Sequence, residues 1–268
     1  MEENAFKTIG VFNPKGGVGK TSMLASIGFE LSKHGKTLII DGDPQGSISY
    51  ILLDRNYERY SEEQKDLLHL FKDGLEVKEC IIKAREEAEE FKGLDIIIPG
   101  NKKDFRSYIS STYQTEGVEK TIREIFDEAK NLGYNYVLYD LPGHLGYYER
   151  SIIAWLTCLM PITEAEDLSK IELDSFLKES RKIQIQFNGS GKINQNLIIN
   201  KVVKGNKVHE HSIQVFEKNM PFFTKHIFYQ SKNISSSISQ HLCVQEYQKN
   251  CPTSQALATL IENIIEEK

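Results

Sequence analysis

The chain has 268 residues, 40% of them hydrophobic and 26% charged, and its formal net charge is −5. This length suits one large α/β domain, which can bury its own core without disulfides or a structural metal. No run reaches the roughly 18 apolar residues of a membrane span, and the amino terminus lacks the apolar run of a signal peptide. The composition therefore predicts a soluble cytoplasmic protein.

Four cysteines are scattered along the chain without C-x-x-C spacing, and we interpret them as reduced thiols. Two histidines, His209 and His211, could be combined with two of the cysteines into a metal site, but the spacing supports none. The four cysteines are Cys80, Cys158, Cys243 and Cys251.

Apolar β-rich runs alternate with helical patterns along the chain. We expect strands at residues 8–13, 37–41, 94–99, 135–141, 157–162, 196–200 and 225–229. Helices are expected at residues 21–34, 118–132, 167–187 and 254–267. This alternation predicts an α/β fold with a mostly parallel, twisted sheet and helices on both faces.

Residues 54–113 are more polar and irregular, with two expected surface helices at residues 61–72 and 77–91. No internal repeat, low-complexity linker or domain boundary is visible, so we expect one domain over residues 1–268. Because the first strand starts near residue 8, we expect no amino-terminal DNA-binding domain before it.

The strongest motif follows the first strand and opens the first helix, which is the setting of a phosphate-binding loop. Its glycines let backbone N–H groups turn toward phosphate oxygens, and the helix amino terminus adds a partial positive charge. Lys20 would contact the β- and γ-phosphates, and the Thr21 hydroxyl would bind Mg²⁺. The motif reads Lys15-Gly16-Gly17-Val18-Gly19-Lys20-Thr21-Ser22.

This loop departs from the general P-loop pattern, because Pro14 occupies the first glycine position and a second lysine, Lys15, follows it. A second cation beside a phosphate site needs an anion to balance it. The arrangement resembles the deviant Walker A motif of the ParA/MinD family of P-loop ATPases. The resemblance implies that Lys15 reaches the nucleotide of a partner subunit, so that ATP and Mg²⁺ hold a homodimer together.

The second expected strand ends in Asp41-Gly42-Asp43-Pro44-Gln45-Gly46, at the edge of the sheet where ligands bind in open α/β folds. This segment looks like the D-x-D-P-Q-G segment of the ParA family. The resemblance implies that Asp43 orients the attacking water and that Asp41 supports the magnesium shell. Gly42 replaces the bulky apolar residue usual in that family.

A later strand ends in Asp140, which is the Walker B arrangement for holding Mg²⁺ through water. Here Gly143-His144 replaces the Pro-Ser of the ParA family's D-x-P-P-S-L-G segment. Another strand ends in Asn200, and the resemblance implies that its amide reads adenine, since an amide both donates and accepts hydrogen bonds.

Charge is distributed unevenly. Residues 181–232 hold nine Lys or Arg and two Asp or Glu, a local net charge of +7 on an acidic protein. In a short ParA-type partition ATPase these lysines would contact DNA phosphates without sequence preference, a ParB-like partner would stimulate hydrolysis, and the protein would associate with the nucleoid. The candidate contacts are Lys201, Lys204, Lys207, Lys218, Lys225 and Lys232.

Three alternatives remain. A MinD-like membrane ATPase would need a basic amphipathic carboxyl-terminal helix, but Glu262, Glu266 and Glu267 make this end acidic. A metallocluster-assembly relative would need suitably placed cysteines. A non-catalytic ATP-binding interaction module would fit the departures at Pro14, Gly42 and His144, whereas the retained Lys20 argues against it.

Overall fold

In the part of the chain that the structure describes, eight strands form one sheet in the order β3-β4-β2-β5-β1-β6-β7-β8. The computed structural model describes residues 6–53, 57–84, 93–111, 117–166 and 169–266. Every pairing between neighbouring strands is parallel except that of β3 with β4. The strands are β1 (Lys7–Phe12), β2 (Thr37–Asp41), β3 (Ile82–Lys83), β4 (Leu94–Ile97), β5 (Tyr136–Asp140), β6 (Cys158–Glu164), β7 (Asn196–Val202) and β8 (Thr224–Tyr229).

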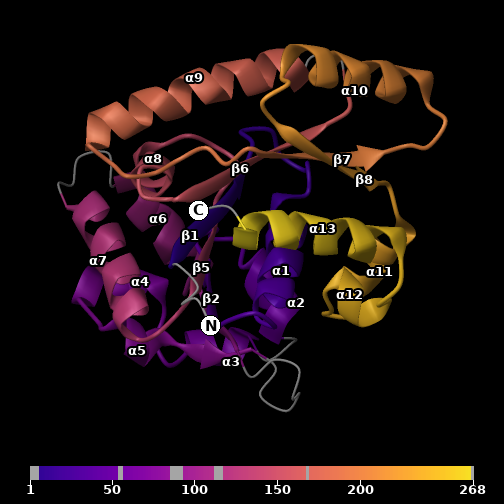
Figure 1. Cartoon of the computed structure of the whole chain (residues 1–268). Helices are drawn as coiled ribbons and strands as arrows, with labels where there is room; N and C mark the ends of the chain where they lie inside the picture. Colours follow the sequence, from indigo (N-terminus) through magenta and orange to yellow (C-terminus); the bar gives the residue numbers. More distant parts are fainter. Residues whose placement is uncertain (1–5, 54–56, 85–92, 112–116, 167–168, 267–268) are drawn as a thin grey trace.

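Helices cover both faces of the sheet (Figure 1). Successive strand residues point to opposite faces, so Leu38 and Ile40 join one hydrophobic cluster and Ile39 joins the other. The first cluster includes side chains of α4 (Leu67–Asp73), α6 (Lys102–Ser111), α7 (Val118–Asn131), α8 (Tyr147–Ile153), α9 (Ser169–Phe187) and α10 (Lys207–Asn219). The second includes side chains of α1 (Lys20–Leu31), α2 (Ser47–Leu53), α11 (Lys232–Ser239), α12 (Val244–Tyr247) and α13 (Pro252–Glu266).

The predicted fold class is confirmed, and the seven predicted strands are found within two residues of their expected ends. The helix predicted at residues 118–132 is α7, and those predicted at 21–34, 167–187 and 254–267 correspond to α1, α9 and α13 within the described residues. The predicted single domain over residues 1–268 stays a prediction.

Two helix predictions between residues 54 and 113 are wrong. Residues 61–72 do not form one helix, because α3 (Tyr57–Ser61) ends there and α4 begins only after Asp66, whose side chain accepts a hydrogen bond from His69 N. The chain predicted as a helix over residues 77–91 forms α5 (Val77–Cys80) and then β3, an edge strand on β4. Residues 85–92 lie outside the described residues.

The parallel strands bring functional candidates to one edge of the sheet. β2 and β5 end in register, with Asp41 opposite Asp140, and the last residue of β6, Glu164, lies opposite Asn200 of β7. The loop that follows β1 lies between these two pairs, because β1 is hydrogen-bonded to β5 on one side and to β6 on the other. This edge is where open α/β sheets bind ligands.

Candidate functional site

A cavity of about 560 Å³ opens at the carboxyl edge of the sheet. This volume is in the range of small-ligand sites. Of the residues predicted to bind a cofactor, those that line the cavity are Gly16, Gly17, Gly19, Lys20, Thr21 and Ser22, and the predicted catalytic residue Asp43 lines it too. The rest of its wall comes from Gln45, Gly46, Ser47, Tyr50, Ile51, Leu141, Gly143 and Ile238.

The loop from Lys15 to Gly19 has the backbone shape of a phosphate cradle. Gly17 and Gly19 adopt φ values of 77° and 97°, which side chains rarely allow. A Cβ on Gly19 would also lie 2.4 Å from the Asn200 side-chain nitrogen, so glycine is required there twice over. The loop leads directly into α1, whose first backbone N–H groups have no partner within the helix and can bind an anion.

The cationic group of the loop is held beside acids. Lys20 is buried, and its Nζ donates to the Lys15 carbonyl oxygen at 3.0 Å. Burial lowers the pKa of Lys20, whereas the carboxylates of Asp140 and Asp43 raise it. Lys20 therefore lies in the electrostatic field of both acids, on the wall of the cavity.

Beneath the loop, Thr21 Oγ1 donates a hydrogen bond to Asp140 Oδ2 at 2.9 Å. The other oxygen of this buried carboxyl, Oδ1, has no hydrogen-bond partner. Burial raises the pKa of Asp140 well above its usual range, and the nearby Asp41 raises it further. A buried carboxylate with an unpartnered oxygen next to a threonine hydroxyl fits a hard divalent cation.

Within the described parts of the chain, no three His, Cys, Asp or Glu side chains converge as a ready-made metal cage. Mg²⁺ in phosphate sites needs few protein ligands, because it retains waters and takes phosphate oxygens from the substrate. Thr21 and Asp140 lie next to each other, as such a site would require, and their binding of Mg²⁺ stays a prediction.

Asp41 is fully buried and organises the turn after β2. Its Oδ2 accepts hydrogen bonds from Ser49 N at 3.0 Å and Ser49 Oγ at 2.6 Å, and its Oδ1 accepts one from Asp43 N at 3.2 Å. Burial raises the pKa of Asp41 to about 7, although the bonds from Ser49 lower it. Asp41 thereby fixes the backbone of Asp43, and its support of a magnesium shell stays a prediction.

Asp43 is half-buried on the cavity wall, where its Oδ1 accepts a hydrogen bond from Gln45 N at 2.9 Å. The structure therefore brings the predicted water-orienting carboxylate and the phosphate loop to the same space. The Asp43 carboxylate raises the pKa of both Lys20 and Asp140.

The structure explains why glycine occupies position 42, where the ParA family usually has a bulky apolar residue. A Cβ at this position would lie 2.3 Å from Tyr139 Cε1, 2.7 Å from the Asp140 carbonyl oxygen and 2.9 Å from Tyr148 Oη. The two tyrosines are fully buried and hydrogen-bonded to each other through their hydroxyls at 2.9 Å. Their side chains occupy the space that a bulky residue at position 42 would need.

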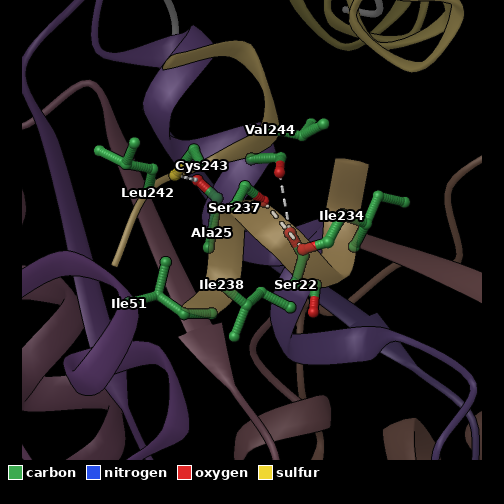
Figure 2. A pocket seen from close by; sticks show the side chains of 10 residues that line it. Ser22, Ala25, Ile51, Ile234, Ser237, Ile238, Leu242, Cys243 and Val244 are labelled. Atoms are coloured by element: carbon green, nitrogen blue, oxygen red, sulfur yellow. Dashed lines mark hydrogen bonds between the residues drawn. The ribbon is translucent and has the colours of Figure 1, made fainter. Parts of the chain in front are cut away.

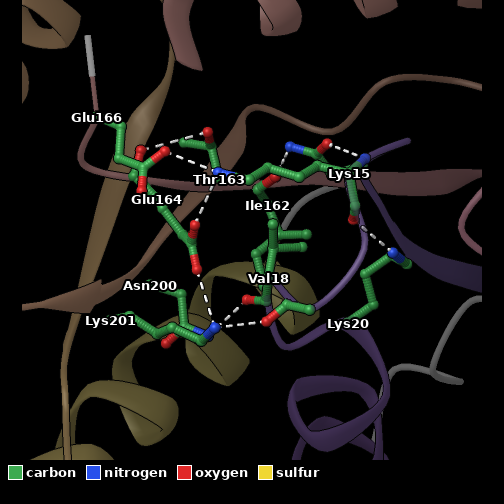
Figure 3. A network of polar contacts seen from close by, with 11 residues as sticks. Lys15, Val18, Lys20, Ile162, Thr163, Glu164, Glu166, Asn200 and Lys201 are labelled. Atoms are coloured by element: carbon green, nitrogen blue, oxygen red, sulfur yellow. Dashed lines mark hydrogen bonds and ion pairs between the residues drawn. The ribbon is translucent and has the colours of Figure 1, made fainter. Parts of the chain in front are cut away.

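Lys15 does not line the cavity, and its ammonium group is paired with two carboxylates. Its Nζ lies 3.0 Å from Glu164 Oε2 and 2.7 Å from Glu166 Oε2 (Figure 3). These carboxylates, with Glu166 the stronger, raise the pKa of the Lys15 ammonium. The sequence had indicated that this lysine needs an anion, but not which one. The available signal was the Thr163-Glu164-Ala165-Glu166 segment at the end of a strand.

Asn200 and Lys201 hold the phosphate loop from the end of β7. Asn200 Nδ2 donates to the Val18 carbonyl oxygen at 2.8 Å, and Lys201 Nζ donates to that of Gly17 at 2.5 Å (Figure 3). Lys201 Nζ also lies 2.9 Å from Glu164 Oε1. Asn200 is buried, and the predicted adenine contact of its amide stays a prediction.

Consecutive strand residues ordinarily point to opposite faces, yet both of these side chains reach one loop. The reason is local: Lys201 has a φ of 56°, and the pairing of β7 with β8 shifts register between Ile199 and Val202. Such a bulge redirects side chains at the end of a strand. The sequence contains no signal for this bulge, because lysine does not favour positive φ.

Helix α11 closes the site over α1. Ile234 and Ile238 of α11 and Ile51 of α2 line a small space together with Ser22 and Ala25 of α1 (Figure 2). Ile238 lines the large cavity as well. The sequence pattern did not predict α11, α2 or α8, which are eight residues long or shorter.

The basic residues from 201 to 232 occupy different settings. Lys201 is engaged at the phosphate loop, and Lys225 Nζ donates to the Met220 carbonyl oxygen at 2.8 Å. The other four predicted DNA contacts are exposed and, within the described residues, form no ion pair; they are Lys204, Lys207, Lys218 and Lys232.

Comparisons with known proteins agree with this geometry. A family model described as an AAA domain matches residues 6–199. The chromosome partitioning protein ParA of Caulobacter vibrioides is 30% identical over 148 residues, 54% of this chain and 51% of that protein. An uncharacterized protein of Methanocaldococcus jannaschii is 28% identical over 144 residues, 52% of each. The chain thus spans about half the length of these two curated relatives.

Two solved structures share the fold over their full length. Apo McdA of Cyanothece superposes with a TM-score of 0.79 at 17% identity, covering 97% of this chain and 99% of that one. A plasmid partition protein of Borrelia burgdorferi bound to AMPPNP gives a TM-score of 0.72 at 20% identity, covering 97% and 100%.

The sheet order and the site are those of a P-loop NTPase: the phosphate loop follows β1, and acidic residues lie at the ends of other strands of the sheet. The matched family model covers more than half of the chain. The chain therefore belongs to the ParA/MinD family of AAA-domain P-loop proteins.

Proposed function

We propose that the protein is a ParA-like ATPase that binds Mg-ATP, dimerises around it, binds DNA without sequence preference and releases it after partner-stimulated hydrolysis. The observation that carries this proposal is the shared cavity: the phosphate loop and Asp43 line one space, and the Thr21–Asp140 pair lies beneath the loop. The Caulobacter relative is a chromosome partitioning protein and the Borrelia structure is that of a plasmid partition protein, and both similarities support the same proposal.

In the proposed reaction, water attacks the γ-phosphorus of ATP and ADP leaves. The loop N–H groups and Lys20 bind the phosphates, and Asp43 orients the water. Thr21 and Asp140 hold Mg²⁺, which neutralises charge on the phosphates when it is bound. The hydrogen bonds around Asp41 keep Asp43 in position, which matters because phosphoryl transfer depends mostly on positioning and electrostatics.

Dimerisation gives Lys15 its proposed role at the partner subunit's nucleotide. Lys15 is 36% exposed and is joined to Glu164 and Glu166. Because Glu166 is itself 54% exposed, the outer ion pair is weak and exchangeable. The ammonium can therefore leave these carboxylates when a phosphate competes for it.

DNA binding is proposed for the exposed lysines beyond the phosphate loop. Lys204 lies in the turn that joins β7 to α10, Lys207 and Lys218 lie at the two ends of α10, and Lys232 begins α11. Lysine contacts with phosphates give binding that weakens as salt rises. Lys201 is a poor probe of DNA contact, since its loss would also disturb the phosphate loop.

The membrane alternative has less support. No helix in the described ranges is long and apolar enough to cross a bilayer. The last helix, α13, buries Leu257, Leu260 and Ile264 in the second hydrophobic cluster, so its apolar face is occupied within the fold. A lipid-binding amphipathic helix needs that face available.

The test is retention on random-sequence duplex DNA with ATP, with ADP and without nucleotide, at two salt concentrations. We expect retention with ATP alone. The double variant Lys204→Ala/Lys207→Ala should lower the slope of log affinity against log salt by about 2, one unit for each lost contact. The matched control is Lys72→Ala/Lys103→Ala, which removes two exposed lysines elsewhere.

Equal retention on DNA with ATP, with ADP and without nucleotide would contradict a nucleotide-switched DNA contact. An equal decrease of the salt slope in the control variant would contradict a contact at these two residues. ATP hydrolysis without DNA retention, together with ATP-dependent binding to vesicles containing anionic lipid, would favour the membrane alternative. Absence of ATP binding altogether would favour neither and would refute the assigned phosphate loop.

A further inference from the structure

The loop between β5 and α8 carries a histidine and a buried acid that the proposed mechanism does not use. His144 is 62% exposed, and its Nε2 lies 3.2 Å from Glu149 Oε1, whose side chain is completely buried. The family pattern has Pro-Ser where this chain has Gly143-His144, so no role for the histidine follows from the resemblance.

Helix capping explains the position of only one of the two Glu149 carboxyl oxygens. Its Oε2 accepts a hydrogen bond from Gly146 N at 2.8 Å, as in a capping box at the start of a helix. Its Oε1 is buried and makes no hydrogen bond, because the contact with His144 has ion-pair distance without hydrogen-bond geometry. A buried carboxylate oxygen without a donor is costly, so a small rotation of the imidazole toward Oε1 is favourable.

The same loop touches the phosphate-binding machinery. A Cβ on Gly143 would lie 3.3 Å from Lys20 Nζ and 3.9 Å from the Pro14 carbonyl oxygen. Since consecutive Cα atoms are about 3.8 Å apart, His144 begins one residue away from the wall of the cavity. The electrostatics agree: burial raises the pKa of Glu149, the His144 imidazole lowers it, and the carboxylate of Asp43 on the cavity wall raises it.

We propose that His144 and Glu149 form a dyad that recognises the terminal phosphate of the bound nucleotide, with Glu149 holding Nε2 of the imidazole and Nδ1 donating to a phosphate oxygen. This inference rests on the proposed ATP binding. An imidazolium between a carboxylate and a phosphate makes two charge-assisted hydrogen bonds, which are about twice as strong as neutral ones. ADP lacks the phosphate that the dyad contacts, so the dyad distinguishes ATP from ADP.

The test compares the Kd of Mg-AMPPNP with that of Mg-ADP by calorimetry. His144→Ala should weaken AMPPNP binding about tenfold, the effect of one lost hydrogen bond to a charged group, and leave ADP binding within about twofold. Glu149→Gln separates charge from capping, because glutamine also completes a capping box. Glu149→Gln should also raise the Kd of Mg-AMPPNP, and it should leave the melting temperature unchanged. The matched control is His211→Ala, an exposed histidine on α10.

Equal changes for both nucleotides, or none for either, would overturn the dyad. If His144→Ala does not fold, Glu149→Gln carries the same test, and His144→Asn, whose amide can donate near the Nδ1 position, should keep AMPPNP binding within about threefold of the parent protein. A parent protein that binds neither nucleotide would refute the proposed function itself, which is a different result from unaltered discrimination in the variants.

Discussion

Gly42 lies between the two acids of the β2 edge, and the structure leaves no room for a side chain there. In Gly42→Ala the new methyl group would meet Tyr139 Cε1 at 2.3 Å and the Asp140 backbone oxygen at 2.7 Å. Neither neighbour can move easily, because Tyr139 is fully buried and Asp140 is held in the central strand β5. Overpacking of this kind destabilises a protein by about 1–3 kcal/mol.

We therefore expect Gly42→Ala to lower the stability by about 2 kcal/mol, which corresponds to a fall in Tm of about 4–8 °C for a domain of this size. Thermal and urea unfolding of the apo protein measure this directly. The hydrolysis rate should fall as well, because the displaced backbone carries Asp43 with it.

A double variant tests the cause. Tyr139→Leu alone should be destabilising, because it leaves a cavity, but Gly42→Ala/Tyr139→Leu should be more stable than the sum of the two single changes predicts, by 1 kcal/mol or so. A change in stability of less than about 0.5 kcal/mol in Gly42→Ala, or strict additivity in the double variant, would refute the steric argument.

Three further predictions concern the nucleotide and pH. Lys20→Ala should abolish ATP binding in calorimetry, since it removes the buried cation of the loop; retained affinity would refute the phosphate-loop assignment. Asp43→Ala should keep ATP binding and stop hydrolysis, and normal phosphate release would remove Asp43 from the mechanism. Burial lowers the pKa of His226, whose Nε2 lies 2.7 Å from Asn196 Oδ1, below its usual value of about 6.5. The unfolded state then binds the proton more tightly, so stability should fall as the pH drops below about 6.5 and level off once it has passed the lowered pKa of the folded state, and His226→Gln should flatten that dependence in urea titrations.

Much of the fold and part of the site could be predicted from local patterns. Strands such as residues 37–41 are continuous apolar runs, because both faces of the sheet are covered, and this pattern is visible in the sequence. The phosphate loop from Lys15 to Ser22 can be recognised from its own residue types, without knowledge of distant contacts. Asp41, Asp43 and Asp140 are found by their position at the ends of such strands, which parallel pairing then brings together.

The remainder depends on contacts between distant segments. Glu164 and Lys15 are 149 residues apart in sequence, and Asn200 and Val18 are 182 apart. The hydrophobic pattern of a sequence does not show which strand ends will contact a given loop. Short helices such as α11 have few turns to show a pattern, and the edge strand β3 has two residues. Residues 61–72 suggested one helix because Asp66, which caps α4, looks in the sequence like an ordinary surface residue within a helix.

The irregular end of β7 has a consequence for how the chain tolerates changes in length. Deleting residue 201 would not be equivalent to substituting it, because the deletion would remove the Lys201 side chain and also shorten the irregular stretch of the strand that directs Asn200 toward the loop. An insertion or gap here would thus alter a loop some 180 positions earlier in the chain. A relative whose phosphate loop is identical but whose chain is one residue shorter or longer at this strand end would therefore lack one of the two hydrogen bonds that Asn200 and Lys201 make to the loop.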